Sequence, residues 1–110
     1  FAGGPVTNWH YYDTIYTERY MGLLQQQEEN YKKSSPIVNA GNLQGKLLVA
    51  HGTGDDNVHY SNTLALINEL IEAGKFAEVM ALPGRGHGVS DPPARRVLMK
   101  RAMQFFLDNL

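Results

Sequence analysis

The stretch from His51 to His59, HGTGDDNVH, constrains the fold of this chain more than any other. An apolar run at residues 46–50 precedes it and has the length of a buried strand. A helical pattern follows at residues 60–73. The order of strand, glycine-rich turn and helix places the adjacent carboxylates Asp55 and Asp56 at the carboxyl end of a strand. In open parallel sheets, ligands and catalytic groups gather at that edge, so a functional site is expected there.

The remaining elements extend this order in both directions. Residues 1–2 are typical of the end of a strand, and residues 9–21 predict a helix that stops at Gly22. A second complete strand is predicted at residues 77–82, and Asp91 followed by proline predicts the start of a last helix. Such alternation is typical of an α/β fold with about three parallel strands, the first truncated, and flanking helices.

Apolar spacing in the two helices that follow the complete strands predicts which side chains are buried. The expected core positions are Leu64, Leu66, Ile67, Leu70, Ile71, Leu98, Ala102, Phe105 or Phe106, and Leu110.

Composition excludes several classes of protein. A formal net charge of −1 over 110 residues gives no electrostatic reason to expect a nucleic-acid partner. Cysteine is absent, so there is no disulfide framework and no thiolate metal site. No apolar run approaches the ~20 residues that cross a bilayer. The first residues lack the features of a signal peptide, and the chain is expected to begin inside a strand.

Asp55 and His87 are the candidate catalytic pair, because each lies in a glycine-flanked turn after a predicted strand. If those strands are neighbours, the aspartate can accept a hydrogen bond from the imidazole and stabilise the imidazolium during general-base catalysis. The order of Asp then His is that of α/β-hydrolases. On spacing alone, the alternative is equally open: Asp55 caps the next helix and His87 is an ordinary surface residue.

Two further interpretations of the turn are less favoured. His51, Asp55, Asp56 and His59 include ligands that suit a cation, but their spacing matches no common zinc pattern. The turn also lacks the Gly-Lys-Ser/Thr ending of a phosphate loop. We therefore expect no metal and no cofactor.

Trp9, Tyr12, Tyr16 and Tyr20 recur at helical spacing and share one face of the predicted helix. For most proteins such a stripe is core packing. Because buried phenol groups need a polar partner or water, a row of tyrosines also suits the wall of a cavity.

A nucleophile for the candidate pair is not evident. A hydrolase of this type carries its serine in a G-x-S-x-G turn. None of the serines of the chain lies in one: Ser34, Ser35, Ser61 and Ser90.

Two segments resemble the dipeptidyl peptidase IV-like members of the prolyl oligopeptidase family of serine peptidases. Residues 51–60 are similar to the family's aspartate loop, and residues 9–22 to the segment that forms its proline pocket. The resemblance covers nearly the whole chain and implies that Asp55 and His87 are the aspartate and histidine of a Ser-Asp-His triad. It implies a hydrogen bond from Asn57 to a substrate carbonyl. The pocket walls that it implies are Trp9, Tyr12, Tyr16, Val58 and, in addition, Val6.

The resemblance also implies that residues 1–110 are the C-terminal part of an α/β-hydrolase catalytic domain. The family's serine, oxyanion hole and β-propeller would then precede Phe1. The expected function is a serine exopeptidase that releases N-terminal dipeptides with penultimate Pro or Ala, and this chain alone is expected to be inactive. Its partners would be such peptides, the N-terminal part of the same protein and, in an open alternative, a second copy in a homodimer.

Three other functions stay open. The parent could be a tripeptidyl or acylaminoacyl peptidase of the same group, an esterase, or an inactive homologue that serves as a binding protein. The sequence does not determine the compartment, although members of the family are often periplasmic, secreted or on the cell surface.

Overall fold

A computed structural model describes residues 1–110, with the exception of the side chain of Tyr11. Its centre is a sheet of three parallel strands, β1 (Ala2–Gly3), β2 (Leu48–Gly52) and β3 (Glu78–Leu82), with β2 in the middle. Leu48 pairs with Glu78 at one end of the β2–β3 ladder and Gly52 with Leu82 at the other. All five residues of β2 are buried, as expected for a central strand between two helical layers.

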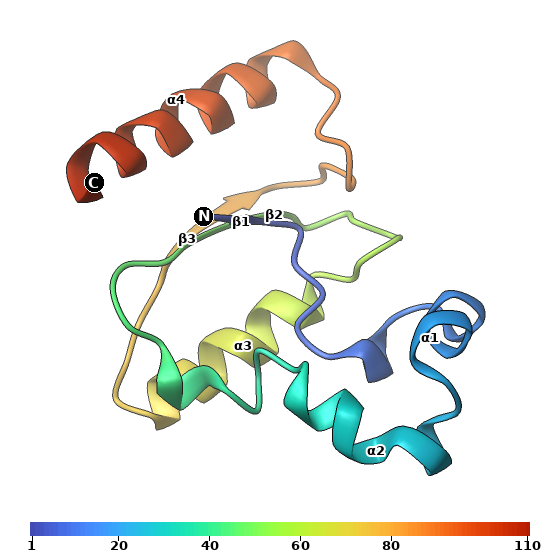
Figure 1. The fold of residues 1–110 in the computed structure, drawn as a ribbon. Coiled ribbons are helices and arrows are strands. Elements are labelled where there is room, and N and C mark those ends of the chain that lie inside the picture. The colour runs from blue at the N-terminus through green and yellow to red at the C-terminus, as the bar shows by residue number, and fades with distance from the viewer.

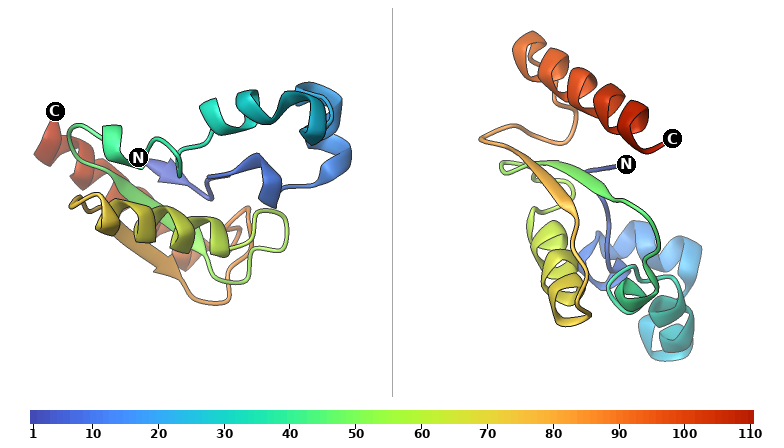
Figure 2. Two further views of the ribbon diagram at one scale, coloured as in Figure 1. Left: turned by 90° about the horizontal axis from the view of Figure 1, so that it is seen from below. Right: turned by 90° about the vertical axis from the view of Figure 1, so that its left-hand side faces the viewer.

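Helices cover both faces of this sheet (Figure 1). The helix α4 (Pro92–Asn109) lies on one face, and α3 (Ser61–Glu72) lies on the other. The N-terminal region adds α1 (Thr14–Met21) and α2 (Leu24–Lys33) with two short 3-10 helices, η1 (Trp9–Tyr11) and η2 (Ala40–Asn42). The two turned views place α1 and α2 on the same side of the sheet as α3 (Figure 2). The α/β fold expected from the sequence is confirmed, and the predicted strands are each displaced by only one or two residues.

The predicted helix boundaries at Gly22 and Asp91 are also present. Gly22 ends α1 with a φ of 79°, a left-handed conformation that favours glycine. An oxygen of the Asp91 side chain accepts a hydrogen bond from the backbone N–H of Ala94 at 3.3 Å, and Pro92 occupies the first helical position. None of the helices in the described part of the chain is long and apolar enough to span a membrane.

The prediction of one helix over residues 9–21 is wrong. The chain forms η1, leaves helical geometry at Tyr12 and Asp13, and starts again as α1. The cause is Asp13, whose Oδ1 accepts hydrogen bonds from the backbone N–H groups of Ile15 at 2.8 Å and Tyr16 at 3.3 Å. An aspartate that binds the backbone in this way starts a new helix instead of continuing an old one.

The expected core is partly wrong. In α3, Leu66 and Leu70 pack with Ala40 as predicted, whereas Leu64 and Ile71 are exposed. In α4, Phe105 is buried but Leu110 is 100% exposed at the end of the chain. Helical spacing identifies several adjacent apolar positions, but the packing of the neighbouring elements decides which of them is covered.

Candidate active site

Two loops leave the carboxyl ends of β2 and β3 side by side, and their backbones touch. The N–H of Thr53 donates to the carbonyl oxygen of Leu82, and the N–H of Gly54 donates to that of Arg85, both at 3.1 Å. A Cβ atom at Gly52 would clash with the Arg85 carbonyl, so this position requires glycine. The two loops therefore form one rigid unit at the edge of the sheet.

Asp55 and His87 meet on this unit. Oδ2 of Asp55 lies 2.8 Å from Nδ1 of His87, although 32 positions separate the two residues. Asp55 is only 4% exposed, whereas 44% of the His87 side chain is exposed, so the imidazole reaches from a buried carboxylate toward solvent. The hydrogen bond expected between the two residues is present.

Helix capping does not explain Asp55. Its Oδ1 accepts hydrogen bonds from the N–H groups of Asn57 at 3.0 Å and Val58 at 2.8 Å, which belong to its own loop. The helix α3 begins only at Ser61 and has no side-chain cap. The carboxylate thus folds the loop around itself and presents its second oxygen to His87.

The pKa of Asp55 reflects two opposed effects. Burial is the largest influence and raises the pKa of the carboxyl group. Hydrogen bonds from His87 and from the N–H groups of Val58 and Asn57 lower it, and together they hold the pKa of Asp55 below its usual value of 3.8. The group is therefore ionised at neutral pH, as an aspartate that stabilises an imidazolium must be.

His51 is a third member of this cluster and was not predicted as such. The sequence indicated it only as a candidate metal ligand. Its ring is 1% exposed, and Nε2 lies 3.2 Å from the same Oδ2 of Asp55 that binds His87. The spacing of four residues between His51 and Asp55 was the only signal for this contact.

The metal interpretation of the loop finds no support in the described residues. Asp56 and His59 are exposed, whereas His51 and Asp55 are buried. Among the side chains that the structure describes, no group of three or more His, Asp or Glu could hold a metal ion.

The loop that carries His87 has two unusual features. Val89 has a φ of 41°, a left-handed conformation that is rare for a β-branched residue. Arg85 forms a two-point ion pair with Asp91, with its Nε 3.3 Å from Oδ1 and its Nη2 3.1 Å from Oδ2. This ion pair joins the two ends of the loop around His87.

Gly4 is another position that the sequence did not single out. A Cβ atom there would lie 3.1 Å from both Cε1 and Nδ1 of the His87 ring and 3.5 Å from Oδ2 of Asp55. Its φ of 52° also favours glycine. The backbone at the end of β1 therefore forms a wall against which the His87 ring rests.

A cavity of about 470 Å³ opens beside the Asp55–His87 pair. It lies between the sheet and α4, whose side chains Leu98, Met99 and Phe106 form part of its wall. The pair thus has space next to it that the described residues do not fill.

The predicted pocket residues Trp9, Tyr12 and Tyr16 form an aromatic ledge beside this site. The rings of Trp9 and Tyr16 are stacked with centroids 6.0 Å apart, and Tyr12 meets Tyr16 edge to face at 5.4 Å. The hydroxyl of Tyr12 donates a hydrogen bond to Oδ1 of Asn57 at 3.0 Å, which ties the ledge to the aspartate loop. Because Tyr16 is 49% exposed, core packing within this chain does not account for the stripe.

The two valines assigned to the same pocket differ from the rings. Val58 is buried and holds the aspartate loop through its backbone N–H, so its side chain presents little surface to a ligand. Val6 is half-buried. Both lie outside the ring contacts that define the aromatic ledge.

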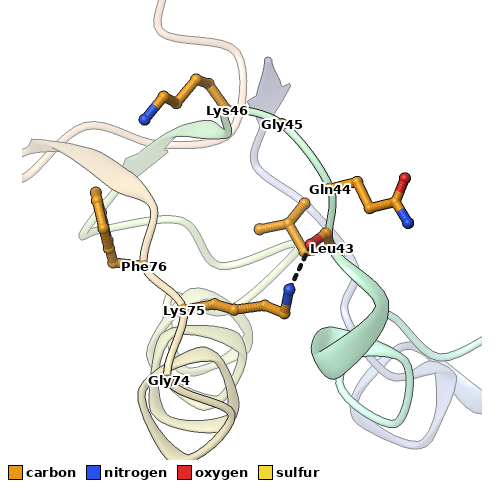
Figure 3. Close-up of a pocket in the computed structure, with 7 residues that line it drawn as sticks. All are labelled: Leu43, Gln44, Gly45, Lys46, Gly74, Lys75 and Phe76. Carbon is orange, nitrogen blue, oxygen red and sulfur yellow. Dashed lines mark hydrogen bonds between the residues drawn. The ribbon is translucent and has the colours of Figure 1, made fainter.

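A second cavity, also about 470 Å³, lies at the opposite end of the sheet (Figure 3). It is lined by residues that precede β2 and β3, and they include Lys46, Lys75 and Phe76. Nζ of Lys75 donates to the carbonyl oxygen of Leu43 at 2.8 Å, and Nζ of Lys46 lies 5.7 Å from the centre of the Phe76 ring. It is lined by no histidine, carboxylate or serine, so it lacks the kinds of side chain that form the Asp55–His87 pair at the other end of the sheet.

Comparison with known proteins identifies the family. The model of the prolyl oligopeptidase family matches residues 1–110. The chain belongs to this family. A probable dipeptidyl-aminopeptidase B from Trichophyton verrucosum is 42% identical over 103 residues, which are 91% of this chain and 11% of that protein. Dipeptidyl peptidase 4 from Felis catus is 37% identical over 107 residues, which cover 94% of this chain and 14% of that protein.

A solved structure gives the same result for the fold. The crystal structure of Porphyromonas gingivalis dipeptidyl peptidase 4 superposes with a TM-score of 0.94 at 35% identity and covers 99% of this chain and 16% of that one. The resemblance to dipeptidyl peptidase IV-like members is confirmed, as is the partial α/β-hydrolase fold that it implied. The chain spans only 11–16% of the length of these relatives.

Proposed function

We propose that this chain supplies the aspartate and histidine of the Ser-His-Asp triad of a serine exopeptidase. The observation that carries the proposal is the hydrogen bond of 2.8 Å between buried, ionised Asp55 and Nδ1 of His87. With Nδ1 engaged by the carboxylate, the other ring nitrogen, Nε2, is left to take a proton from a nucleophile and return it to a leaving amine. Asp55 fixes the tautomer and stabilises the imidazolium.

The nucleophile comes from another part of the polypeptide. Ser34 and Ser35 donate their hydroxyl hydrogens to the carbonyl oxygens of Tyr31 and Thr7, and Ser35 is buried. In the described part of the chain, no hydroxyl is hydrogen-bonded to Nε2 of His87. None of the four serines of the chain lies in a G-x-S-x-G turn. In this proposal, residues 1–110 are the C-terminal part of a catalytic domain, and the segment with the serine and the oxyanion hole packs beside the pair.

The substrate of this peptidase is a peptide with proline or alanine in the second position. The half-buried ring of Trp9 and the exposed ring of Tyr16 offer a flat apolar surface beside the catalytic pair, and a pyrrolidine ring stacks well on such faces. The hydroxyl of Tyr12 engages Oδ1 of Asn57, which directs the amide N–H₂ of Asn57 outward as a donor to a substrate carbonyl. The names of the relatives favour release of dipeptides over tripeptides.

The test compares the 110-residue chain with a longer polypeptide that contains it and its N-terminal neighbour. We expect the longer polypeptide to hydrolyse a Gly-Pro chromogenic substrate and to react with a fluorophosphonate probe, and the short chain to do neither. A matched tripeptide substrate and a simple ester separate the tripeptidyl and esterase alternatives.

Three results would contradict the proposal. Turnover or serine labelling by the short chain would show that the nucleophile lies within it. A longer polypeptide that prefers the tripeptide or the ester would have a different substrate. The absence of turnover by a folded longer polypeptide would favour the inactive homologue.

A further inference from the structure

The ring of His51 is buried, and both of its nitrogens have partners. Nδ1 lies 2.7 Å from the hydroxyl oxygen of Thr63. Nε2 lies 2.8 Å from the carbonyl oxygen of Val58 and 3.2 Å from Oδ2 of Asp55. The triad chemistry of the proposed function does not use this histidine.

The partners determine that Nε2 carries a hydrogen. A backbone carbonyl and an ionised carboxylate only accept hydrogen bonds, so Nε2 must carry a hydrogen and donate to both. The hydroxyl of Thr63 can donate to Nδ1, which then needs no hydrogen of its own. A neutral ring with its hydrogen on Nε2 therefore satisfies every contact.

This ring completes the set of contacts around Asp55. Two backbone N–H groups bind Oδ1, and the two histidines His51 and His87 bind Oδ2. Val58 is held twice, because its N–H donates to Asp55 and its carbonyl accepts from His51. His51 thus fixes both the carboxylate and the far end of its loop, which carries Asn57.

We propose that His51 is a positioning residue for the catalytic pair, which keeps Oδ2 of Asp55 directed at Nδ1 of His87. The proposal rests on the proposed function, since the pair needs positioning only if it performs catalysis. Without the donor, the carboxylate and the Val58 carbonyl would be buried with an unmade hydrogen bond, and the loop would shift to satisfy them. At metal sites, loss of a hydrogen-bond partner that orients a ligand typically lowers affinity or activity by about 10- to 100-fold, and we expect a loss of the same order here.

Two substitutions at this position separate positioning from folding. His51→Gln keeps an N–H donor near the place of Nε2, whereas His51→Leu keeps similar volume and removes the donor. Leu70→Ala is the control, because Leu70 is equally buried but packs in the cluster of Ala40 and Leu66. All three are made in the longer polypeptide, and kcat, KM and Tm are measured with a Gly-Pro substrate.

We expect His51→Leu to lower kcat by about 10- to 100-fold with a smaller change in KM, and His51→Gln to recover most of that loss. Leu70→Ala should lower Tm and leave kcat unchanged. If His51→Leu lowers Tm but retains kcat, or if His51→Gln is as slow as His51→Leu, His51 has only a structural role and the proposal is overturned.

A second measurement on the unsubstituted protein does not depend on turnover or on the folding of any variant. Nitrogen-15 spectra of the histidine rings report which nitrogen carries hydrogen. Hydrogen on Nε2 of His51 supports the proposal, and a ring with hydrogen on Nδ1 alone overturns it. An inactive wild-type protein whose His51 carries hydrogen on Nε2 would contradict the proposed function. It would still show that His51 donates a hydrogen bond to Asp55.

Discussion

The catalytic pair and the aromatic ledge lie next to each other but are held in place by different means. Asp55 is buried, and four hydrogen-bond donors surround its carboxylate. Tyr16 is half exposed and is held by contacts between rings. One hydrogen bond, from Tyr12 to Asn57, joins the two regions. Under the proposed function, the pair provides fixed geometry and the ledge contacts the substrate, so substitutions in the two should affect different kinetic constants.

The largest expected effect is that of Asp55→Asn in the longer polypeptide. The amide cannot stabilise an imidazolium and favours the wrong tautomer of His87, so kcat should fall by about 10⁴-fold while KM changes little. Steady-state kinetics with a Gly-Pro substrate measure this. A loss smaller than tenfold would show that the carboxylate is structural and would remove the contrast with the ledge.

Tyr16→Ala should weaken the fit of the substrate's proline ring and leave the rate of the chemical step nearly unchanged. Removal of one ring from an apolar pocket costs about 1–3 kcal/mol of discrimination, so kcat/KM for Gly-Pro should fall about 10- to 200-fold relative to a bulkier dipeptide substrate. Little change in Tm is expected because the ring is half exposed. An unchanged preference for proline in a folded variant would mean that the stripe is packing after all.

Tyr12→Phe tests the link between the two regions. The ring stays in place, but the hydrogen bond to Asn57 is lost, which is worth about 0.5–1.5 kcal/mol. We expect KM to rise by about two- to tenfold with kcat nearly unchanged, because only Asn57, the proposed donor to the substrate carbonyl, loses its orientation. Asn57→Ala is the companion variant: in its background, Tyr12→Phe should have no further effect. Additive losses would show that the two groups act independently.

Arg85→Gln should have the smallest effect. The ion pair with Asp91 lies at the surface and lowers the pKa of Asp91, chiefly through the hydrogen bond from Arg85. Exposed pairs contribute little and are screened by salt, so kcat/KM should change a few-fold at most, and high salt should reproduce the change in the wild type. A loss as large as that of Asp55→Asn would show that the ion pair holds His87 in place and that the loop is less rigid than its backbone contacts indicate.

The sequence was sufficient where the signal is local. The strand, turn and helix around residues 46–73 and the start of α4 at Asp91 follow from patterns only a few residues long. The prediction of a single helix over residues 9–21 was wrong because the Asp13 side chain binds backbone N–H groups. Helical periodicity carries no information about this effect. The prediction that Leu110 is buried was wrong because periodicity identifies an apolar face of a helix but not the element that covers it.

The site was predictable to the extent that two parallel strands bring their carboxyl ends together. That rule made a contact between Asp55 and His87 one of two open interpretations, and the family resemblance favoured it over helix capping. It could not place His51, whose role depends on the return of the Val58 carbonyl to the ring at the end of β2. It could not place the Tyr12–Asn57 contact either, because 45 positions separate the partners and no pattern connects them.

The strained backbone of Val89 predicts which substitutions laboratory evolution would select in this loop. Its left-handed φ of 41° costs a β-branched residue on the order of 1–3 kcal/mol, and it lies two positions after His87. Glycine or asparagine adopts that conformation readily, so a selection for thermal tolerance should enrich Val89→Gly or Val89→Asn early. If the strain helps to hold the His87 imidazole in place, the selected variants will have a higher Tm and a lower kcat than the wild type. A comparison of Tm with kcat across these variants measures this trade-off.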